Sequence, residues 1–333
     1  MKGKRTPTAT ACGLLLILIL LLTLMAGSCR KREVELKIGG GPRGGTFEEI
    51  AAGLAEILNA NLAGVRVTAT SSGGSVANLL DVHRENLDMG LVFAGDAYLG
   101  RGGRLKEDLP PTTGVLALAR LYGATAHLVV SGQGAIRHVA DLRGRRIAIG
   151  SAGSGSAQAA RRFFESFGMW ESIIPMHEGY AVGMEDLRWG NVDAVWLQVG
   201  YPSEYLLEVG HVMPLRLIDL YDSALVGGLF SAYPFYAYAS IPAGTYRGQE
   251  QDILTFQDAT LWVAGPALSE EFVYNALQAL FSEKGLERMH TAHPAAWDLG
   301  IAKGLMGVKI PLHPGAERFW KEQGIPLHTL PQR

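Results

Sequence analysis

Cysteine is nearly absent from this sequence: only Cys12 and Cys29 occur among 333 residues. Cys12 lies in a segment that we expect to be removed, so the mature fold has no disulfide and no cysteine-based metal site. Charged residues make up 19% of the chain and the basic ones are scattered, which excludes a typical nucleic-acid partner. Because 48% of the residues are hydrophobic, a large core must stabilise the protein, and the length allows two lobes.

Signatures of common enzyme classes are missing as well. The sequence contains no Gly-x-Ser-x-Gly nucleophile elbow and no His-Glu-x-x-His zinc motif. His290 and His293 are three positions apart, and without a further ligand we expect them to be surface histidines near a helix end. We therefore predict no catalytic residues, no metal site and no enzymatic activity.

One stretch matches the dinucleotide-binding pattern, with Gly39, Gly41 and Gly44 between a predicted strand and a predicted helix. A nicotinamide cofactor also needs an acidic residue about 20 positions further on, at the end of the second strand. Thr70 and Ser71 stand at that place. We therefore predict that the protein has no cofactor.

The N-terminus has the composition of an export signal. Three of the first five residues are basic, residues 13–27 are almost wholly apolar, and Cys29 follows small residues. The apolar core is short for a membrane span and normal for a signal peptide. We predict a lipoprotein-type signal peptide over 1–28, a lipid-modified Cys29 and a linker over 29–35. An ordinary signal peptide and an uncleaved anchor are the alternatives, and all three place the body of the protein outside the cytoplasmic membrane.

The pattern of the remaining chain predicts an α/β fold. Strands are expected at 36–38, 65–70, 89–93, 116–121, 127–131, 146–150, 193–197 and 260–264. Helices are expected at 47–58, 76–84, 157–167, 203–209 and 269–284. Alternating strands and helices indicate mostly parallel sheets with helices on both faces. The strand–turn–helix unit recurs near residues 40 and 150, so we predict one lobe from 36–130 plus 256–333, a second from 131–255, and a ligand cleft between them.

Glycine- and serine-rich turns open several of the predicted helices. Such turns present free backbone N–H groups at a positive helix end, which suits an anionic ligand such as a carboxylate. The candidate ligand-binding residues are Gly44, Gly45 and Thr46 in the first turn, Ser72, Ser75 and Asn78 in the second, Ser154, Gly155, Ser156 and Gln158 in the third, and Gln198 and Tyr201 after a later strand. The alternative is that each turn only caps its helix; Thr46 followed by Glu49 fits a capping box.

Six motifs carry a family resemblance in the same order along residues 36–327: IGGGPRGGTF, TSSGGSVANL, DLRGRRIAIGSAGSGS, GNVDAV with GYP, IPAGTY, and PLHPGAERFWKEQGIP. The chain resembles TAXI-type solute-binding proteins of TRAP transporters. The resemblance implies a two-lobed periplasmic-binding-protein-like fold (type II) that closes on an organic acid, often an amino acid or a dicarboxylate, and docks on a TRAP-type permease. By motif, it implies a ligand shell of Gly45, Thr46, Ser75, Asn78, Ser154, Gly155 and Ser156.

The chain departs from that family at one place. Many relatives have a polar Gln-Ser-Asp-like group after the third strand, whereas this chain has Phe93, Ala94, Gly95 and Asp96. Phe93 offers an apolar surface to a ligand, which disfavours a plain dicarboxylate; its alternative place is the core. The alternative function is a ligand-binding sensor module that acts on a membrane partner, and a neighbouring permease gene would distinguish transport from sensing.

Overall fold

The computed structural model describes residues 33–105 and 109–327. The predicted signal peptide over 1–28 and the predicted lipidation site Cys29 lie outside the described residues. Within the described chain, no helix is both long enough and apolar enough to cross a membrane.

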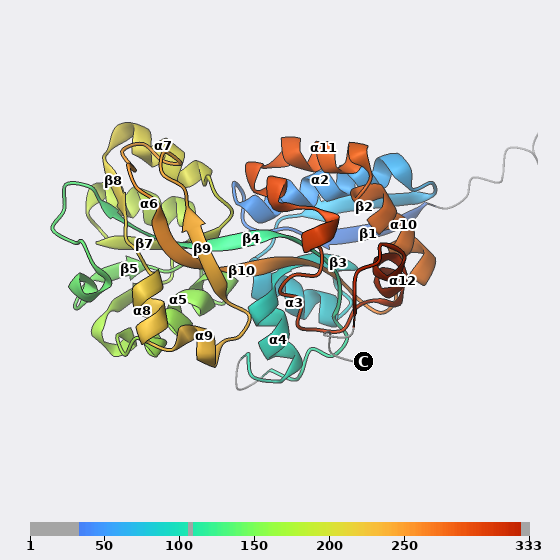
Figure 1. The fold of residues 1–333 in the computed structure, drawn as a ribbon, viewed down its shortest axis with the longest axis horizontal. Helices are drawn as coiled ribbons and strands as arrows, with labels where there is room; N and C mark the ends of the chain where they lie inside the picture. Colours follow the sequence, from blue (N-terminus) through green and yellow to red (C-terminus); the bar gives the residue numbers. More distant parts are fainter. Residues whose placement is uncertain (1–32, 106–108, 328–333) are drawn as a thin grey trace, which may run out of the picture.

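Two α/β halves lie side by side, and the long strands β4 (Leu116–Ser131) and β10 (Ile253–Ala264) run through both of them (Figure 1). The strands form one 10-stranded sheet in the order β2-β1-β3-β10-β4-β7-β5-β6, with β8 on β4 and β9 on β10. The other strands are β1 Val34–Gly39, β2 Val65–Thr70, β3 Met89–Phe93, β5 Arg146–Ala148, β6 Ile174–Met176, β7 Ala194–Val199, β8 Leu215–Leu217 and β9 Ala237–Ile241. We call the half with β1, β2 and β3 the first half, and the half with β5, β6 and β7 the second half.

Helices flank the sheet in both halves (Figure 1). The first half contains α2 Thr46–Asn61, α3 Ser75–His83, α4 Ala94–Arg101, α10 Glu270–Leu280, α11 Glu283–Ala292 and α12 Pro314–Glu322. The second half contains α5 Gly155–Ser166, α6 Tyr180–Trp189, α7 Glu204–Val212, α8 Tyr221–Val226 and α9 Leu229–Ala232. Short 3-10 turns are η1 Val139–Leu142, η2 Trp170–Ser172, η3 Pro294–Asp298 and η4 Ile301–Lys303.

The predicted parallel pairing is confirmed in the outer part of each half. β1 is parallel to β2 and β3, and β5 is parallel to β6 and β7. At the centre, however, β10 is antiparallel to β3 and β4, and β4 is antiparallel to β7. The sheet is therefore mixed, because the chain leaves the first half along β4 and returns along β10 in the opposite direction.

Two predicted element boundaries also need correction. The strands expected at 116–121 and 127–131 are one continuous strand, β4. The helix expected over 269–284 is divided into α10 and α11. The division follows from Ser282, whose side chain accepts a hydrogen bond from the backbone N–H of Gly285 at 3.1 Å. Serine at this position starts a new helix turn.

Each half has its own hydrophobic core. In the first half, Leu91 and Trp262 of the central strands are fully buried. In the second half, the Phe163 ring lies 5.4 Å from the Trp196 ring and 5.8 Å from the Phe256 ring, measured between centroids. Burial of apolar surface is the main stabilising contribution in such cores. β4 and β10 therefore join two separately packed bodies.

The Pro-Leu-His-Pro-Gly-Ala segment fastens the C-terminal helix to the first half. Leu312 forms a β-bridge with Ala117 on β4. His313 caps α12 by accepting a hydrogen bond from Gly315 N at 3.2 Å. A Cβ on Gly315 would lie 2.3 Å from the carbonyl oxygen of Glu270, so glycine lets α12 approach α10 closely.

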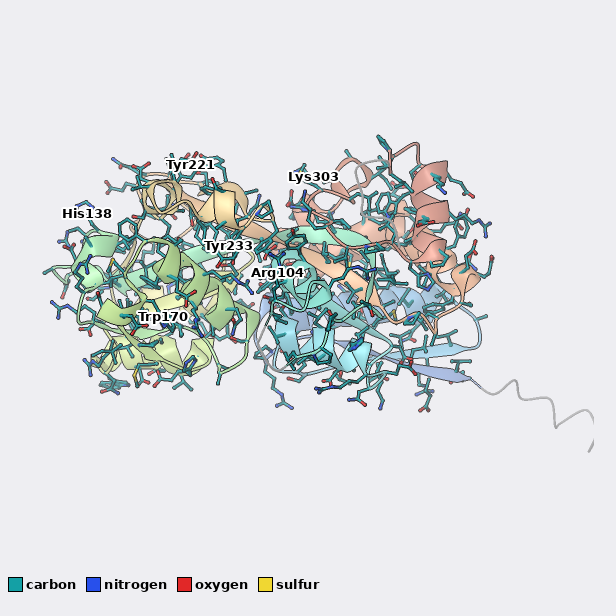
Figure 2. All side chains as sticks on the ribbon, turned by 90° about the horizontal axis from the view of Figure 1, so that it is seen from below. Arg104, His138, Trp170, Tyr221, Tyr233 and Lys303 are labelled. Atoms are coloured by element: carbon teal, nitrogen blue, oxygen red, sulfur yellow. The ribbon has the colours of Figure 1, made fainter. Side chains whose placement is uncertain are left out.

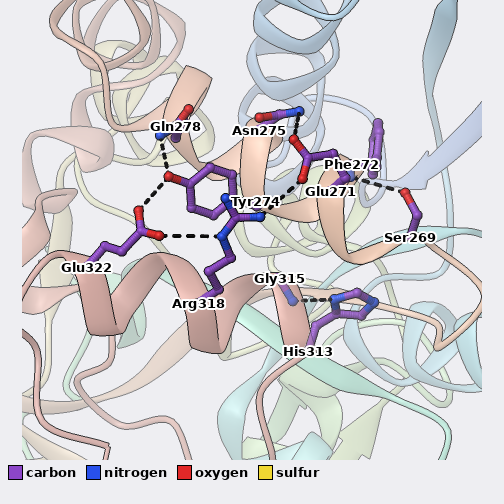
Figure 3. A network of polar contacts seen from close by, with 10 residues as sticks. All are labelled: Ser269, Glu271, Phe272, Tyr274, Asn275, Gln278, His313, Gly315, Arg318 and Glu322. Carbon is purple, nitrogen blue, oxygen red and sulfur yellow. Dashed lines mark hydrogen bonds and ion pairs between the residues drawn. The ribbon is translucent and has the colours of Figure 1, made fainter.

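Side chains then hold α12 against α10 (Figure 3). The Arg318 guanidinium carbon lies 3.9 Å from the centroid of the Tyr274 ring, within the range of a cation–π contact. The Tyr274 hydroxyl donates to Glu322 at 2.5 Å, and Arg318 pairs with Glu271 at 3.1 Å. This segment is part of the framework of the first half and lies away from the junction of the halves (Figure 1).

Candidate ligand-binding cavity between the two halves

A cavity of about 50 Å³ is lined by residues of both halves. The first half contributes the starts of α2 and α3 and the end of β3. The second half contributes the starts of α5 and α6 and the end of β7. Such a cavity between two packed bodies is a common position for a small-molecule site.

Phe93, the N-cap of α4, lines the cavity, but Gly95 N–H in the first turn of that helix already donates to Asp258. Four other helices, two from each half, also begin at this cavity. Their N-cap residues Gly45, Gly74, Ser154 and Gly179 all line it. Within the described chain, no side chain caps the helices that follow the three glycines. Ser154 caps its own helix through the N–H of Ala157. First-turn N–H groups therefore point partial positive charge at one place, which favours an anion.

Aromatic rings form the apolar part of the wall. Phe47 and Phe93 line the cavity and pack edge to face, with ring centroids 5.1 Å apart. Tyr122 of β4 and Tyr180 of α6 add two further rings. Phe93 is also a member of the core of the first half. The two places left open for it by the sequence, ligand surface and core, therefore coincide.

Gln198 lies on the cavity wall at the end of β7. Its Nε2 donates to the carbonyl oxygen of Ala124 at 2.6 Å. The backbone carbonyl of Gln198 accepts from the Tyr180 hydroxyl at 3.2 Å. The side chain is 2% exposed, and among the described residues its Oε1 has no hydrogen-bond partner. An unpaired buried amide oxygen is costly.

His293 holds Thr46 on the cavity wall. The His293 Nδ1 accepts from Ala295 N at 2.9 Å, so Nε2 carries the proton and donates to the Thr46 hydroxyl at 3.3 Å. Burial lowers the pKa of His293 to about 4. The prediction of a surface histidine is wrong here, because His293 turns inward at the end of α11 and caps η3.

Acidic side chains of α2 and α7 lie near one another across the junction of the halves. Burial, together with the neighbouring carboxylates of Glu204 on α7 and Glu48 on α2, raises the pKa of Glu49 to about 7. The Tyr205 hydroxyl on α7 also donates to the Arg43 carbonyl at 2.6 Å. Ionisation of Glu49 therefore opposes the packing of α7 against the start of α2.

We expect Glu49 to make stability depend on pH. Its folded-state pKa lies above the ordinary value of 4.5, so the folded protein binds this proton more tightly than the unfolded chain does. The resulting stabilisation is complete below about pH 4.5 and is lost as the pH rises through about 7. As the pH rises from about 4.5 to about 7, the melting temperature of the wild type should decrease relative to that of Glu49→Gln. Parallel pH profiles of the two proteins would contradict this.

A buried ion pair joins the halves next to the cavity. Arg162 of α5 donates from Nη2 to Asp96 Oδ1 of α4 at 2.8 Å, and Asp96 Oδ2 accepts from the Ser75 hydroxyl at 2.6 Å. Asp96 is 0% exposed and Arg162 is 6% exposed. Ser75 lines the cavity. We call Arg162, Asp96 and Ser75 the interlobe bridge.

A second buried carboxyl, Asp258 of β10, lies beside the interlobe bridge. It accepts the backbone N–H of Gly95 at 3.1 Å. Burial raises the pKa of Asp258 well above its usual range, and the charge of Asp96 raises it further. Burial therefore favours the neutral form of Asp258, and the guanidinium of Arg162 pairs with Asp96.

Aromatic contacts accompany the bridge. Phe235 of the second half lies 5.9 Å from the Tyr98 ring of α4 and 5.7 Å from the Tyr233 ring. Arg104 covers the Tyr98 ring at 5.3 Å, and Figure 2 shows Arg104 and Tyr233 on either side of the junction of the halves. The contact between the halves therefore combines a buried charge pair with an aromatic cluster.

Many of the predicted ligand-binding residues lie on the cavity wall: Gly45, Thr46, Ser75, Phe93, Ser154, Gly155, Ser156 and Gln198. The others, Gly44, Ser72, Asn78, Gln158 and Tyr201, are not among the lining residues. Asn78 is buried and its amide donates to the carbonyls of Gly40 and Leu91. The Ser72 hydroxyl donates to Gly40 at 2.9 Å. Asn78 and Ser72 thus fasten the first turn to its neighbours.

Several wall residues were not predicted from the sequence. Gly179 and Tyr180 start α6 after a strand of only 3 residues, β6. That short strand gives too weak a periodic signal to mark the turn as a site. The sequence analysis did not single out Tyr122 or Phe47, because a lone aromatic residue has no motif that marks it as part of a site. Both residues reach the cavity only because strands and helices far apart in the chain pack together there.

The side chains of the cavity wall are uncharged types. No cavity-lining residue is Asp, Glu, Lys, Arg, His or Cys. In the part of the chain that the structure describes, no group of three or more His, Cys, Asp or Glu is arranged to hold a metal ion. The wall offers N–H groups, hydroxyls, one amide and aromatic faces, which together suit a small anion with an apolar part.

The fold is α/β, with two halves that share one mixed sheet and a cavity lined by both. The chain belongs to the NMT1-like family, whose model matches residues 38–324.

Among solved structures, the chain is similar to the alkanesulfonate-binding protein SsuA from Xanthomonas axonopodis pv. citri bound to MOPS, with 15% identity, 86% of this chain and 83% of that chain covered, and a TM-score of 0.48. It is also similar to PhnD1 from Prochlorococcus marinus in complex with methylphosphonate, with 13% identity, 78% of this chain and 91% of that chain covered, and a TM-score of 0.48. Lipoprotein Tp32 from Treponema pallidum matches with 12% identity, 79% of this chain and 98% of that chain covered, and a TM-score of 0.44.

Proposed function

We propose that this protein is an extracytoplasmic solute-binding protein that captures a small organic acid. The observation that carries the proposal is the meeting of four helix N-termini, two from each half, at one cavity without a charged lining residue. Backbone N–H groups at helix starts bind a carboxylate without needing a cationic side chain. The absence of paired acid and base residues on the described wall fits capture of the ligand without turnover.

Binding would couple the ligand to the relative position of the halves. We propose that 36–130 plus 256–333 and 131–255 move as two lobes. An acid that contacts N-termini from both lobes has more contacts in the closed arrangement than in an open one, so it stabilises closure by that difference. Lobe closure would then be the signal that a membrane partner recognises.

The TAXI-type motifs extend the proposal to a partner and a location. They support delivery of the acid to a TRAP-type permease driven by an ion gradient. The predicted signal peptide over 1–28 and Cys29 support a periplasmic or outer-face location with a lipid anchor. Both parts rest on the sequence.

A thermal-shift screen of the full chain against monocarboxylates, dicarboxylates, 2-oxo acids and amino acids tests ligand capture. An acid that binds only the folded state raises the melting temperature with its concentration. The lack of a shift with every acid class would overturn the proposal.

Ser154→Asp tests the position of the anion. Aspartate caps a helix as well as serine does, so the fold should persist while a negative charge enters the cavity wall. We expect at least tenfold weaker binding of the acid found in the screen, measured by calorimetry. Ser269→Asp is the matched control, because Ser269 caps α10 in the same way and is not among the cavity-lining residues. Unaltered affinity of Ser154→Asp would refute this anion site.

A further inference from the structure

Three buried polar atoms of cavity-lining residues have no partner among the described residues: Gln198 Oε1 and the hydroxyl oxygens of Tyr122 and Ser156. Because hydroxyls can donate as well as accept, Gln198 Oε1 is the one of the three that can only accept. Gln198 is 2% exposed, and among the described residues its Oε1 has no partner. The orientation of the amide follows from its other end, because a donor must face the Ala124 carbonyl at 2.6 Å. The nitrogen is therefore fixed on Ala124, and the oxygen is the end left for another molecule.

The backbone of Gln198 is held in place, so it cannot shift to bring Oε1 to a donor of the protein. Its carbonyl accepts from the Tyr180 hydroxyl at 3.2 Å, and its N–H approaches the same oxygen at 3.4 Å. Its strand, β7, pairs with β4 at Ala126. Gln198 is thus held from three sides, and Oε1 stays where the fold puts it.

Burial of an unpaired amide oxygen carries a penalty that a ligand donor removes. We propose that Gln198 selects, among small acids, those that carry a hydroxyl or ammonium group in addition to the carboxylate. This inference rests on the proposed function and names the substrate class of the same cavity. The carboxylate lies at the helix N-termini, the hydroxyl or ammonium group donates to Gln198 Oε1, and the apolar body contacts the rings of Phe47 and Phe93.

The expected selectivity is substantial. An acid that lacks the donor fills the cavity but leaves Oε1 desolvated and unpaired, and sites with such groups reject analogues that cannot pair with them. We expect an acid with the donor to bind at least tenfold more tightly than the same acid without it.

Matched pairs of acids test this by calorimetry on the full chain. L-lactate is compared with propionate, L-2-hydroxyisovalerate with isovalerate, and L-alanine and L-valine report on the ammonium donor. We expect the hydroxy or amino acid of each pair to bind at least tenfold more tightly than its unsubstituted partner. Equal affinities within the pairs would overturn the role of Gln198 while leaving acid capture intact. Failure of every acid to bind would overturn the proposed function, and this inference with it.

Gln198→Met supplies the second measurement. Methionine keeps the length of the side chain and removes the amide oxygen, so the preference within each pair should shrink to less than about threefold, with propionate and isovalerate binding at least as well as to the wild type. Gln158→Met is the matched control, because Gln158 is not among the cavity-lining residues; its preference should equal that of the wild type. An undiminished preference in Gln198→Met would overturn the inference. If that variant does not fold, the affinities of the wild type for the matched acids test the inference by themselves.

Discussion

Arg162→Met should destabilise the protein by about 3–5 kcal/mol, measured as the free energy of unfolding in urea. The substitution leaves Asp96 buried at 0% exposure without its guanidinium partner. A buried carboxylate cannot recover its lost hydration, so it must remain unpaired or take up a proton. The nearby Asp258 is a second buried carboxyl and cannot supply the missing positive charge.

Two further variants separate this effect from a general loss of packing. Arg161→Met removes the preceding arginine, which is exposed and pairs with Glu165 one turn later; such pairs contribute at most about 1 kcal/mol. The double variant Asp96→Asn with Arg162→Met removes both charges and should recover part of the lost stability. If Arg161→Met and Arg162→Met destabilised the protein equally, the interlobe bridge would have no special role.

Gly155→Ala should weaken ligand binding at least tenfold, because the halves cannot approach as they do here with a side chain at this position. A Cβ on Gly155 would lie 2.6 Å from Asp96 Oδ2, 2.6 Å from Phe93 Cδ2 and 2.7 Å from Ser75 Cβ. Gly155 belongs to the second half, and all three neighbours belong to the first. Distances this short require the halves to move apart.

Two measurements check this expectation. Calorimetry with the acid identified by the screen gives the affinity, and X-ray scattering gives the radius of gyration, which should stay large in Gly155→Ala when the acid is added. Gly300→Ala is the matched control, because nothing lies within 4 Å of an added Cβ there and its φ of 177° is open to any residue. Wild-type affinity in Gly155→Ala would show that close approach at α5 is not required.

The sequence predicted the parts of the fold that depend on local signals. The bounds expected for β2 and β3 agree with the structure, because short runs of alternating or continuous apolar residues are ended by turn residues. The starts of α2, α3 and α5 were marked by glycine and serine, which favour helix N-termini. Their gathering at one cavity followed from the strand–turn–helix pattern, since parallel strands place such turns at the same edge of a sheet.

Contacts between distant parts of the chain could not be predicted. Arg162 and Asp96 are 66 positions apart, and Thr46 and His293 are 247 positions apart; neither pair has a sequence pattern that links it. Asn78 has the position of a ligand-binding residue on the first turn of α3, yet its amide donates to Gly40, 38 positions earlier. The sequence shows which chemical groups a segment contains, whereas the pairing of strands determines which residues those groups contact.

The place of β10 in the sheet has a consequence for the order in which the protein can fold. β10 is the last strand along the chain, yet it lies between β3 and β4 at the centre. Its Asp258 bonds to Gly95, which is 163 positions earlier. Contacts of such long sequence separation form slowly, because a large loop must close first. The first half therefore cannot complete its sheet until β10, which ends at Ala264, has been synthesised, although β1, β2 and β3 are made much earlier.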